Sequence, residues 1–304
     1  MEMTVNSPAG PAVVPMPGPP RSVEWPKVIL FTVLLVAAFF PVMKGMVNQW
    51  WTDDDMGHGF FVPVVAAYVA WQRRDAILAG PLEPNWLGLI PLLWGSLQSY
   101  VANLGAEFFL ARSAIIFSVI GAVWLVCGTR VLKLLAFPIA LLCFMVPLPT
   151  VIYNQITMPL QFFASSVAEA TLNLLGYPVF REGNILEMAN NRLSVVEACS
   201  GIRSLLTLTF LSVVYGFFAD DKPWMRAVLL VGVVPIAIFA NSVRVTLTGV
   251  ISEYNKEWAE GFFHTMEGWV IFMVAFALLL ALHRFVNGFY NMLQRAKTEA
   301  PLEA

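Results

Sequence analysis

The stretch "VVEACSGIRSL", residues 195–205, joins two kinds of sequence that fold differently. Upstream of it, apolar and polar residues alternate, as they do along a β-strand with one buried face. Downstream, an apolar run begins at about residue 202, which favours a membrane helix. A small polar turn between them holds Cys199, and Arg203 follows four residues later. The stretch therefore predicts a strand that delivers a thiol to the end of a membrane helix.

The composition of the whole chain indicates a membrane protein. Of its 304 residues, 58% are hydrophobic and 12% are charged, whereas a soluble domain usually carries about 25% charged residues. The formal net charge of -2 provides no basic surface for neutralising phosphates, which argues against nucleic acid as a partner. The fold class we predict is an all-α polytopic membrane protein.

The apolar segments predict about eight transmembrane helices, because a helix needs about 20 mainly apolar residues to cross the hydrocarbon. They cover about residues 28–46, 59–72, 87–105, 112–128, 132–149, 202–219, 224–250 and 265–285. Residues 1–26 are rich in Pro and Gly, which predicts a disordered cytoplasmic tail. We expect a single membrane domain over residues 27–290 and a second cytoplasmic tail over residues 291–304.

Residues 151–176 form a less apolar stretch whose polar residues recur on one side of a helix, so it either spans or lies in the interface plane as an amphipathic helix. The total numbers of Lys and Arg on the two sides do not decide between these alternatives. Without a ninth span, however, five consecutive cytoplasmic segments each hold at least two basic residues near a span end. We therefore prefer eight spans with both termini cytoplasmic, which places Cys199 on the extracytoplasmic side.

Residues 177–201, "YPVFREGNILEMANNRLSVVEACSG", predict an extracytoplasmic β-hairpin between the amphipathic helix and the cysteine. Apolar and polar residues roughly alternate along it, and Asn190 and Asn191 tolerate the left-handed backbone of a tight turn. Its second strand delivers Cys199 to the top of the next helix.

Arg244, in "IFANSVRVTLTG", is the clearest candidate functional residue inside a predicted span. A charged side chain there costs about 2.5–3.5 kcal/mol on insertion scales, so it marks a functional site by default. Asn241 lies three residues earlier and projects from nearly the same helix face. The alternative is that Arg244 lies near the outer end and snorkels to lipid headgroups.

Two histidines and a second arginine fall on the same predicted side of the membrane. His264, in "GFFHTMEGW", opens the last span and is either catalytic or a structural hydrogen-bonding residue. His58, in "DDDMGHGFF", competes with it at the start of the second span. Arg203 shares a helix face with Cys199 if the helix begins near Gly201, or else pairs with Glu197 or a lipid phosphate.

The remaining cysteines and histidines predict no metal site and no cofactor. Cys127 and Cys143 lie inside apolar runs, where cysteine usually behaves as a small hydrophobe. Neither a C-x-x-C pair nor histidines at ligand spacing occur.

Cys199, His264 and Arg244 together supply the three parts that acyl transfer needs. A thiolate is the nucleophile and is favoured by a nearby positive charge or a histidine. The reaction also needs a donor for the developing oxyanion and an acid for the leaving amine.

These residues resemble the exosortases and archaeosortases, a family of polytopic membrane cysteine transpeptidases. The matching pieces are "EACSGIRSL" with Cys199, "NSVR" with Arg244 and His264 before the last span, in the order of the family pattern. "MGHGFFVP", with His58, is similar to a further family motif of the form S-H-G-x-x-V-P. The resemblance covers about residues 28–290, without an appended C-terminal domain.

The resemblance implies a protein-sorting enzyme of a bacterial inner membrane, linked with extracellular polysaccharide. Its partners would be secreted proteins with a C-terminal Pro-Glu-Pro-type (PEP-CTERM) motif, a hydrophobic helix and a basic tail. Cys199 would form a thioester, Arg244 would stabilise the oxyanion and His264 would act as acid and base, with Arg203, Asn241 and His58 in support. A membrane lipid or another nucleophile would be the acceptor.

Two other functions remain open from the residues alone. The same site could hydrolyse the thioester with water, as a protease without ligation. Alternatively, the chain is a non-enzymatic transporter or scaffold of polysaccharide export, in which Cys199 only packs and its replacement by alanine keeps function.

Overall fold

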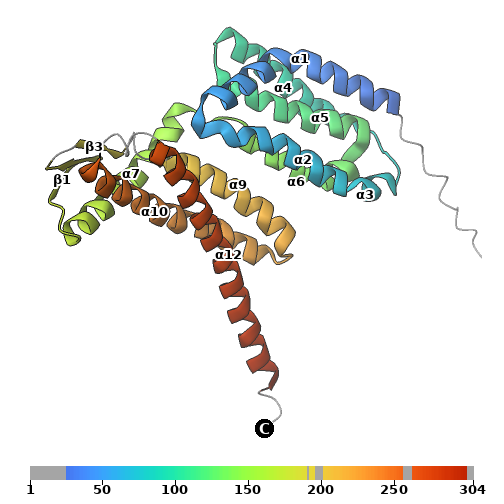
Figure 1. Cartoon of the computed structure of the whole chain (residues 1–304). Coiled ribbons are helices and arrows are strands. Elements are labelled where there is room, and N and C mark those ends of the chain that lie inside the picture. Colours follow the sequence, from blue (N-terminus) through green and yellow to red (C-terminus); the bar gives the residue numbers. More distant parts are fainter. Residues whose placement is uncertain (1–24, 190–191, 196–200, 256–261, 300–304) are drawn as a thin grey trace, which may run out of the picture.

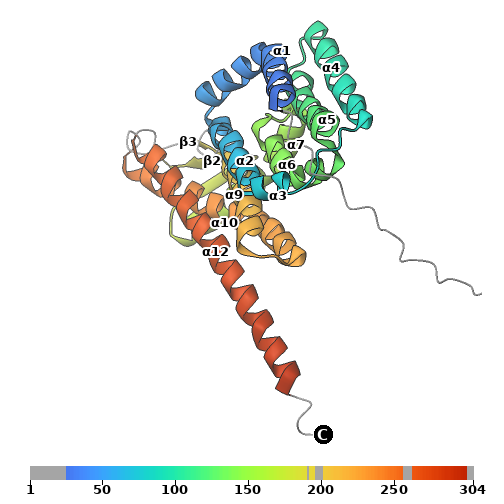
Figure 2. The ribbon, with the colours of Figure 1, turned by 90° about the vertical axis from the view of Figure 1, so that its right-hand side faces the viewer.

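A computed structural model describes residues 25–189, 192–195, 201–255 and 262–299. Within these ranges the chain is mostly helical, and its helices form two groups (Figure 1). The first group holds α1 to α6, and the second holds α7, α9, α10 and α12 with a small sheet. In Figure 2, α1, α4 and α5 lie together on one side and α12 runs down the other.

The first group begins with a long helix and continues through shorter ones. Their bounds are α1 Trp25–Thr52, the 3₁₀ helix η1 Asp54–Phe60, α2 Phe61–Gln72, α3 Arg74–Leu78, the 3₁₀ helix η2 Trp86–Gly88, α4 Leu89–Leu104, α5 Phe108–Leu134, α6 Ala136–Leu141 and the 3₁₀ helix η3 Leu142–Met145. A buried cluster that includes Met46, Val62 and Leu141 also contains Phe210, which belongs to the second group. Phe210 lies on α9, Gly201–Ala219, so α9 links the two groups.

Glycines allow α4 and α5 to approach at backbone distance. A Cβ at Gly88 would lie 2.3 Å from the backbone nitrogen of Leu125, and one at Gly121 would lie 2.5 Å from that of Leu92. At Gly95 the nearest atom would be the Ser118 hydroxyl, at 2.5 Å. Small residues of this kind are the usual contact between membrane helices, because lipid offers no hydrophobic force to hold them together.

Gly128 interrupts α5 and separates two spans that the sequence predicts, 112–128 and 132–149. Its φ of 87° and ψ of 175° are not helical, and a Cβ there would lie 2.0 Å from the Glu83 carbonyl oxygen. Only glycine combines this dihedral with so close an approach. The chain therefore changes direction here and continues through α6 and η3.

The second group contains the elements that carry the sequence-predicted site. They are α7 Thr150–Leu174, β1 Val179–Glu182, β2 Ile185–Met188, β3 Arg192–Ser194, α9 Gly201–Ala219, α10 Pro223–Tyr254 and α12 Phe262–Glu299. One buried cluster joins α7, the sheet and α10 through Ala168, Leu186 and Val245. Another joins α9, α10 and α12 through Leu208, Leu229 and Leu279.

The predicted two-stranded hairpin is a three-stranded antiparallel sheet in the order β1-β2-β3. Glu182 pairs with Ile185, so β1 and β2 are joined by the two residues Gly183 and Asn184. Gly183 has a φ of 64°, the left-handed conformation that a tight hairpin turn requires. The turn predicted at Asn190 and Asn191 lies outside the described residues, and the turn at Gly183 and Asn184 adds a strand to the prediction.

The polar side of α7 holds this sheet. The Asn173 side chain donates to the Val179 carbonyl at 3.3 Å and accepts from its N–H at 3.1 Å. Arg181 of β1 donates to Glu169 at 2.9 Å. Of the polar residues that predict an amphipathic helix, Asn173 and Glu169 thus contact β1.

Within the described residues, four helices are long and apolar enough to cross a membrane: α1, α5, α10 and the part Trp269–Arg295 of α12. A fifth is possible if Ala136–Met145 and Thr150–Leu174, which meet at 81°, form one broken span. The protein is therefore a helical membrane protein. The count is lower than the eight predicted. The helices α2 and α4 have only 12 and 16 residues, the predicted span 202–219 contributes a shorter apolar helix over Ser204–Ala219, and the predicted span 132–149 belongs to the bent pair.

We expect Gly128→Ala to lower the free energy of unfolding by at least about 1–3 kcal/mol, the typical cost of a backbone conformation that almost only glycine adopts. Thermal unfolding in detergent measures the change. The control is Gly288→Ala on α12, where a Cβ meets nothing within 4 Å. Equal stability of both variants would contradict the backbone approach at Gly128.

Candidate active site

Arg244 lies on a buried polar face of α10. Asn241, Arg244, Thr248 and Ser252 recur at intervals of three or four residues, and each is at least nine-tenths buried. Arg244 and Thr248 are engaged in interactions within the folded chain. An arginine that snorkelled to headgroups would be exposed, so the 8% exposure of Arg244 favours an internal role.

This polar face lies beside the sheet that leads to the cysteine. Val245, next to Arg244, shares a buried cluster with Val195, which follows β3. The Val195 N–H donates to the Asn184 carbonyl at 2.9 Å, which fixes the end of the sheet. In Figure 1 the sheet lies at the end of the molecule where α10 ends and α12 begins.

The structure describes the backbone of two further predicted site residues, Arg203 and His264, but not Cys199. Cys199 lies outside the described residues, between Val195 and the start of α9 at Gly201. Arg203 and His264 belong to the first turns of α9 and α12, and their side chains lie outside the described part. The structure therefore places the helices that carry them.

His58 lies in η1 and is 8% exposed. Its Nδ1 atom has no hydrogen-bond partner in the part of the chain that the structure describes.

A set of long-range hydrogen bonds holds η1 in place. The Tyr153 hydroxyl of α7 donates to the Asp55 carboxylate at 2.6 Å, and the Trp50 indole donates to the Met145 carbonyl at 3.1 Å. Gly59 makes room for that indole, since a Cβ would lie 2.5 Å from it. Sequence analysis did not single out Tyr153, whose only signal is a hydroxyl near the start of the amphipathic helix.

The structure brings some candidates together and leaves others apart. Asn241 and Arg244 share the buried face of α10. His58 is on a separate element, but η1 contacts α9, the helix that follows Cys199. Among the described residues, no group of three His, Cys, Asp or Glu side chains could hold a metal ion.

Comparison with known proteins places the chain in a family. The model of the transmembrane exosortase family matches residues 50–281, more than half of the 304-residue chain. No curated protein and no solved structure matches. The matched segment contains η1 with His58, the β-sheet, and α10 with its buried Arg244. The chain therefore belongs to the transmembrane exosortase family.

Proposed function

We propose that this protein is a cysteine transpeptidase that cleaves the C-terminal sorting signal of secreted proteins and transfers them to an acceptor. Family membership supports a membrane transpeptidase-type role in general. The observation that carries the proposal furthest is the burial of Arg244 with Asn241, Thr248 and Ser252 on one face of a membrane helix. Polar groups are costly in an apolar solvent, so a polar face within a membrane helix favours a functional role.

In the proposed mechanism, the Cys199 thiolate attacks the backbone carbonyl carbon near the sorting motif. The guanidinium of Arg244 donates to the oxyanion of the tetrahedral intermediate. The carbon–nitrogen bond then breaks, a protonated His264 gives its proton to the leaving amine, and a thioester remains on Cys199. Neutral His264 next takes a proton from the acceptor, which attacks the thioester and releases the thiolate.

The proposed substrate carries a Pro-Glu-Pro-type motif, a hydrophobic helix and a basic tail. The hydrophobic helix anchors the substrate in the same bilayer and brings the scissile bond to the depth of the start of α9. Holding reactants in register can supply about 7–11 kcal/mol of barrier reduction in favourable cases. A membrane anchor therefore replaces the deep cleft of a soluble enzyme.

We propose eight spans in a bacterial inner membrane, with both termini cytoplasmic. The short helices support this count, because η1 with α2 covers residues 54–72 and η2 with α4 covers residues 86–104. Each run has the length of a short span. The 81° bend before α7 is consistent with α7 lying in the interface plane.

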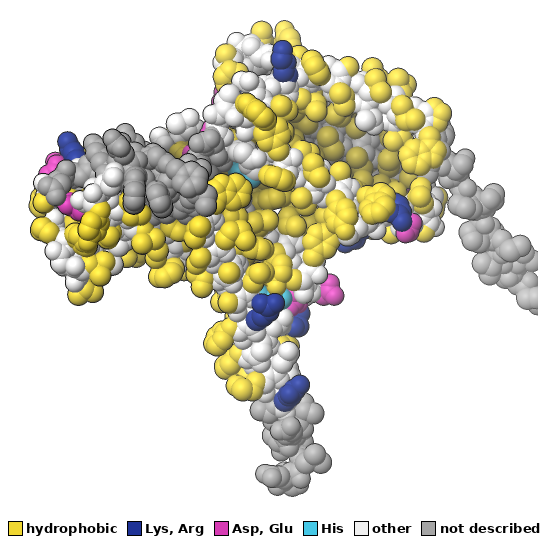
Figure 3. All heavy atoms as spheres, in the orientation of Figure 1, with side chains coloured by type: hydrophobic (Ala, Val, Ile, Leu, Met, Phe, Trp, Pro, Cys, Tyr) yellow, Lys and Arg dark blue, Asp and Glu magenta, His cyan; other side chains and the backbone are white. Residues whose placement is uncertain are grey.

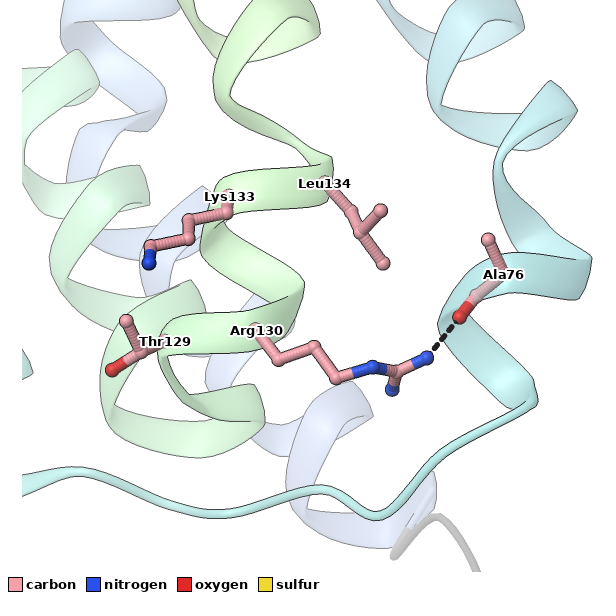
Figure 4. Close-up of a pocket in the computed structure, with 5 residues that line it drawn as sticks. All are labelled: Ala76, Thr129, Arg130, Lys133 and Leu134. Atoms are coloured by element: carbon pink, nitrogen blue, oxygen red, sulfur yellow. Dashed lines mark hydrogen bonds between the residues drawn. The ribbon is translucent and has the colours of Figure 1, made fainter.

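The orientation rests on basic residues at one end of the first group. Figure 4 shows Arg130 and Lys133, near the end of α5, beside a hollow, and Arg130 donates to the Ala76 carbonyl of α3. Arg73 and Arg74 lie at the junction of α2 and α3. Such a cluster next to span ends is typical of the cytoplasmic side. The opposite side, with Arg244 and the sheet, would then be extracytoplasmic.

Two alternative functions use the same chain. A protease would hydrolyse the thioester with water at the same residues. A non-enzymatic component of polysaccharide export would use Arg244 and Asn241 to line a path. The buried polar face of α10 is compatible with both alternatives, so the presence and the mass of a processed product distinguish the three functions.

The test is processing of a co-expressed substrate with a Pro-Glu-Pro-type C-terminal signal, followed by intact mass of the mature product. We expect Cys199→Ala to abolish processing and Cys143→Ala, a matched control at an exposed free cysteine, to preserve it. Added mass on the product identifies the acceptor. A free carboxyl end means a protease, and processing that survives Cys199→Ala overturns the proposal.

We expect Arg244→Lys to slow processing at least about 100-fold, the usual cost of losing one oxyanion donor. Lysine keeps the charge but loses the planar fork of donors. The control is Arg192→Lys at an exposed position of β3. Processing is measured per amount of folded enzyme, and near-normal activity of Arg244→Lys would remove Arg244 from the oxyanion role.

A further inference from the structure

A polar cluster joins α9, α10 and α12 at the end opposite to the candidate site. It consists of Tyr215 of α9, Asp220 and Lys222 of the turn between α9 and α10, and His283 and Asn287 of α12, and we name these five residues the polar clasp. In Figure 3, charged side chains and a histidine gather where α12 leaves the other helices. The side chains of Asp220 and His283 are 6% and 9% exposed.

Asp220 and His283 form the centre of the clasp. The Tyr215 hydroxyl lies 2.7 Å from His283 Nδ1, and His283 Nε2 lies 3.3 Å from Asp220 Oδ2. The Asn287 Nδ2 atom also lies 3.0 Å from His283 Nε2. One ring nitrogen of His283 therefore contacts α9 and the other contacts Asp220, so α9, α12 and the α9–α10 turn are joined through one ring.

Asn287 and Lys222 complete the connection. Asn287 donates to Asp220 Oδ2 at 3.1 Å and accepts from the Lys222 ammonium at 3.0 Å. The backbone N–H of Lys222 donates to Asp220 Oδ1 at 2.8 Å. Burial acts to raise the pKa of Asp220, but the hydrogen bonds from Lys222, His283 and Asn287 together lower it. The ionised Asp220 side chain therefore connects α12 with the turn between α9 and α10.

Arg226 fixes the turn that carries Asp220. Its Nε donates to the Asp220 carbonyl at 2.8 Å and to the Gly216 carbonyl at 3.1 Å, near the end of α9. These two hydrogen bonds hold the turn to α9 and α10 without any contribution from α12.

Side-chain packing next to the clasp sets the same alignment of α12. Leu282 precedes His283 and fits against Gly232 of α10, where a Cβ would lie 2.4 Å from the leucine side chain. Leu229 of α10 and Leu279 of α12 are fully buried in the cluster that joins α9, α10 and α12. Shifting α12 by one turn would move Leu282 away from Gly232 and His283 away from Asp220.

The clasp lies about one bilayer thickness from the candidate catalytic residues. His264 and His283 are 19 residues apart on α12, which is about 28 Å along a helix. The 19 residues of α9 separate Asp220 from the Cys199 end by a similar length. On α10, Lys222 is followed by Arg244 after 22 residues. The hydrocarbon core is about 30 Å thick.

We propose that the polar clasp is a positioning device, which fixes the depth and rotation of α12 relative to α9 and α10 and thereby places His264 against Cys199 and Arg244. This inference rests on the proposed function. In lipid, sliding one apolar helix along another exchanges apolar contacts for apolar contacts, so a fit such as that of Leu282 against Gly232 specifies the register less strongly than paired polar groups do. A buried carboxylate and imidazole specify it strongly, because every other register leaves them unpaired.

The test measures processing per amount of folded enzyme in clasp variants. We expect Asp220→Ala to lower processing about tenfold or more, and Asp220→Asn to retain most of it, because the amide oxygen still accepts from His283. Tyr215→Phe removes a single hydrogen bond, and we expect a loss of about fivefold. It serves as the second variant where Asp220→Ala does not fold. Gly288→Ala, on the same helix with open space around it, is the control and should change nothing.

A distance measurement separates positioning from stability. Spin labels at Tyr254→Cys on α10 and Trp269→Cys on α12, both exposed residues, report the alignment of the two helices in a background where Cys127, Cys143 and Cys199 are alanine. We expect Asp220→Ala to shift or broaden the distance, on the order of one helical turn of 5.4 Å, and Asp220→Asn to preserve it.

Unchanged processing in Asp220→Ala, or reduced processing with an unchanged distance, would overturn the inference. The distance measurement needs no activity, so it tests the clasp even if processing proves independent of Cys199.

Discussion

Two apolar helices in hydrocarbon gain no hydrophobic free energy when they contact each other instead of lipid. The architecture of this protein follows from that constraint. Helices must then be held by close van der Waals contact or by polar groups that lipid cannot satisfy. The α4–α5 pair uses the first solution, because Gly88, Gly95 and Gly121 bring the backbones together. The second group adds polar contacts: Asn173 and Glu169 bind the sheet to α7, and Asp220 binds α12 to the α9–α10 turn.

The same constraint explains why α10 is central to the proposed chemistry. A helix that buries Arg244 and Asn241 must present them to protein rather than to lipid. At its other end α10 is tied to α9 through Arg226 and to α12 through Gly232. A helix with a polar face at one end and fixed neighbours at the other can hold an oxyanion donor without a soluble domain around it.

The long apolar helices could be predicted from the sequence because their signal is local. The expected spans 28–46, 224–250 and 265–285 fall within α1, α10 and α12. The buried face with Asn241 and Arg244 also follows from helical spacing. Other features depend on distant partners: the break at Gly128 is understood only with the Glu83 carbonyl against it, and Asp220 and His283 are 63 residues apart. The third strand is a different case, because the Gly183-Asn184 turn signal is local and is present in the sequence.

The central claim is that Cys199 becomes acylated during turnover, and trapping the intermediate tests it most directly. Enzyme and substrate are mixed in vesicles, quenched in acid and analysed by intact mass and peptide mapping. The account predicts substrate attached to Cys199 through a bond that hydroxylamine cleaves, and none in the Cys199→Ala enzyme. Processing by the wild type that proceeds without any such adduct, and equally in Cys199→Ala, would contradict it.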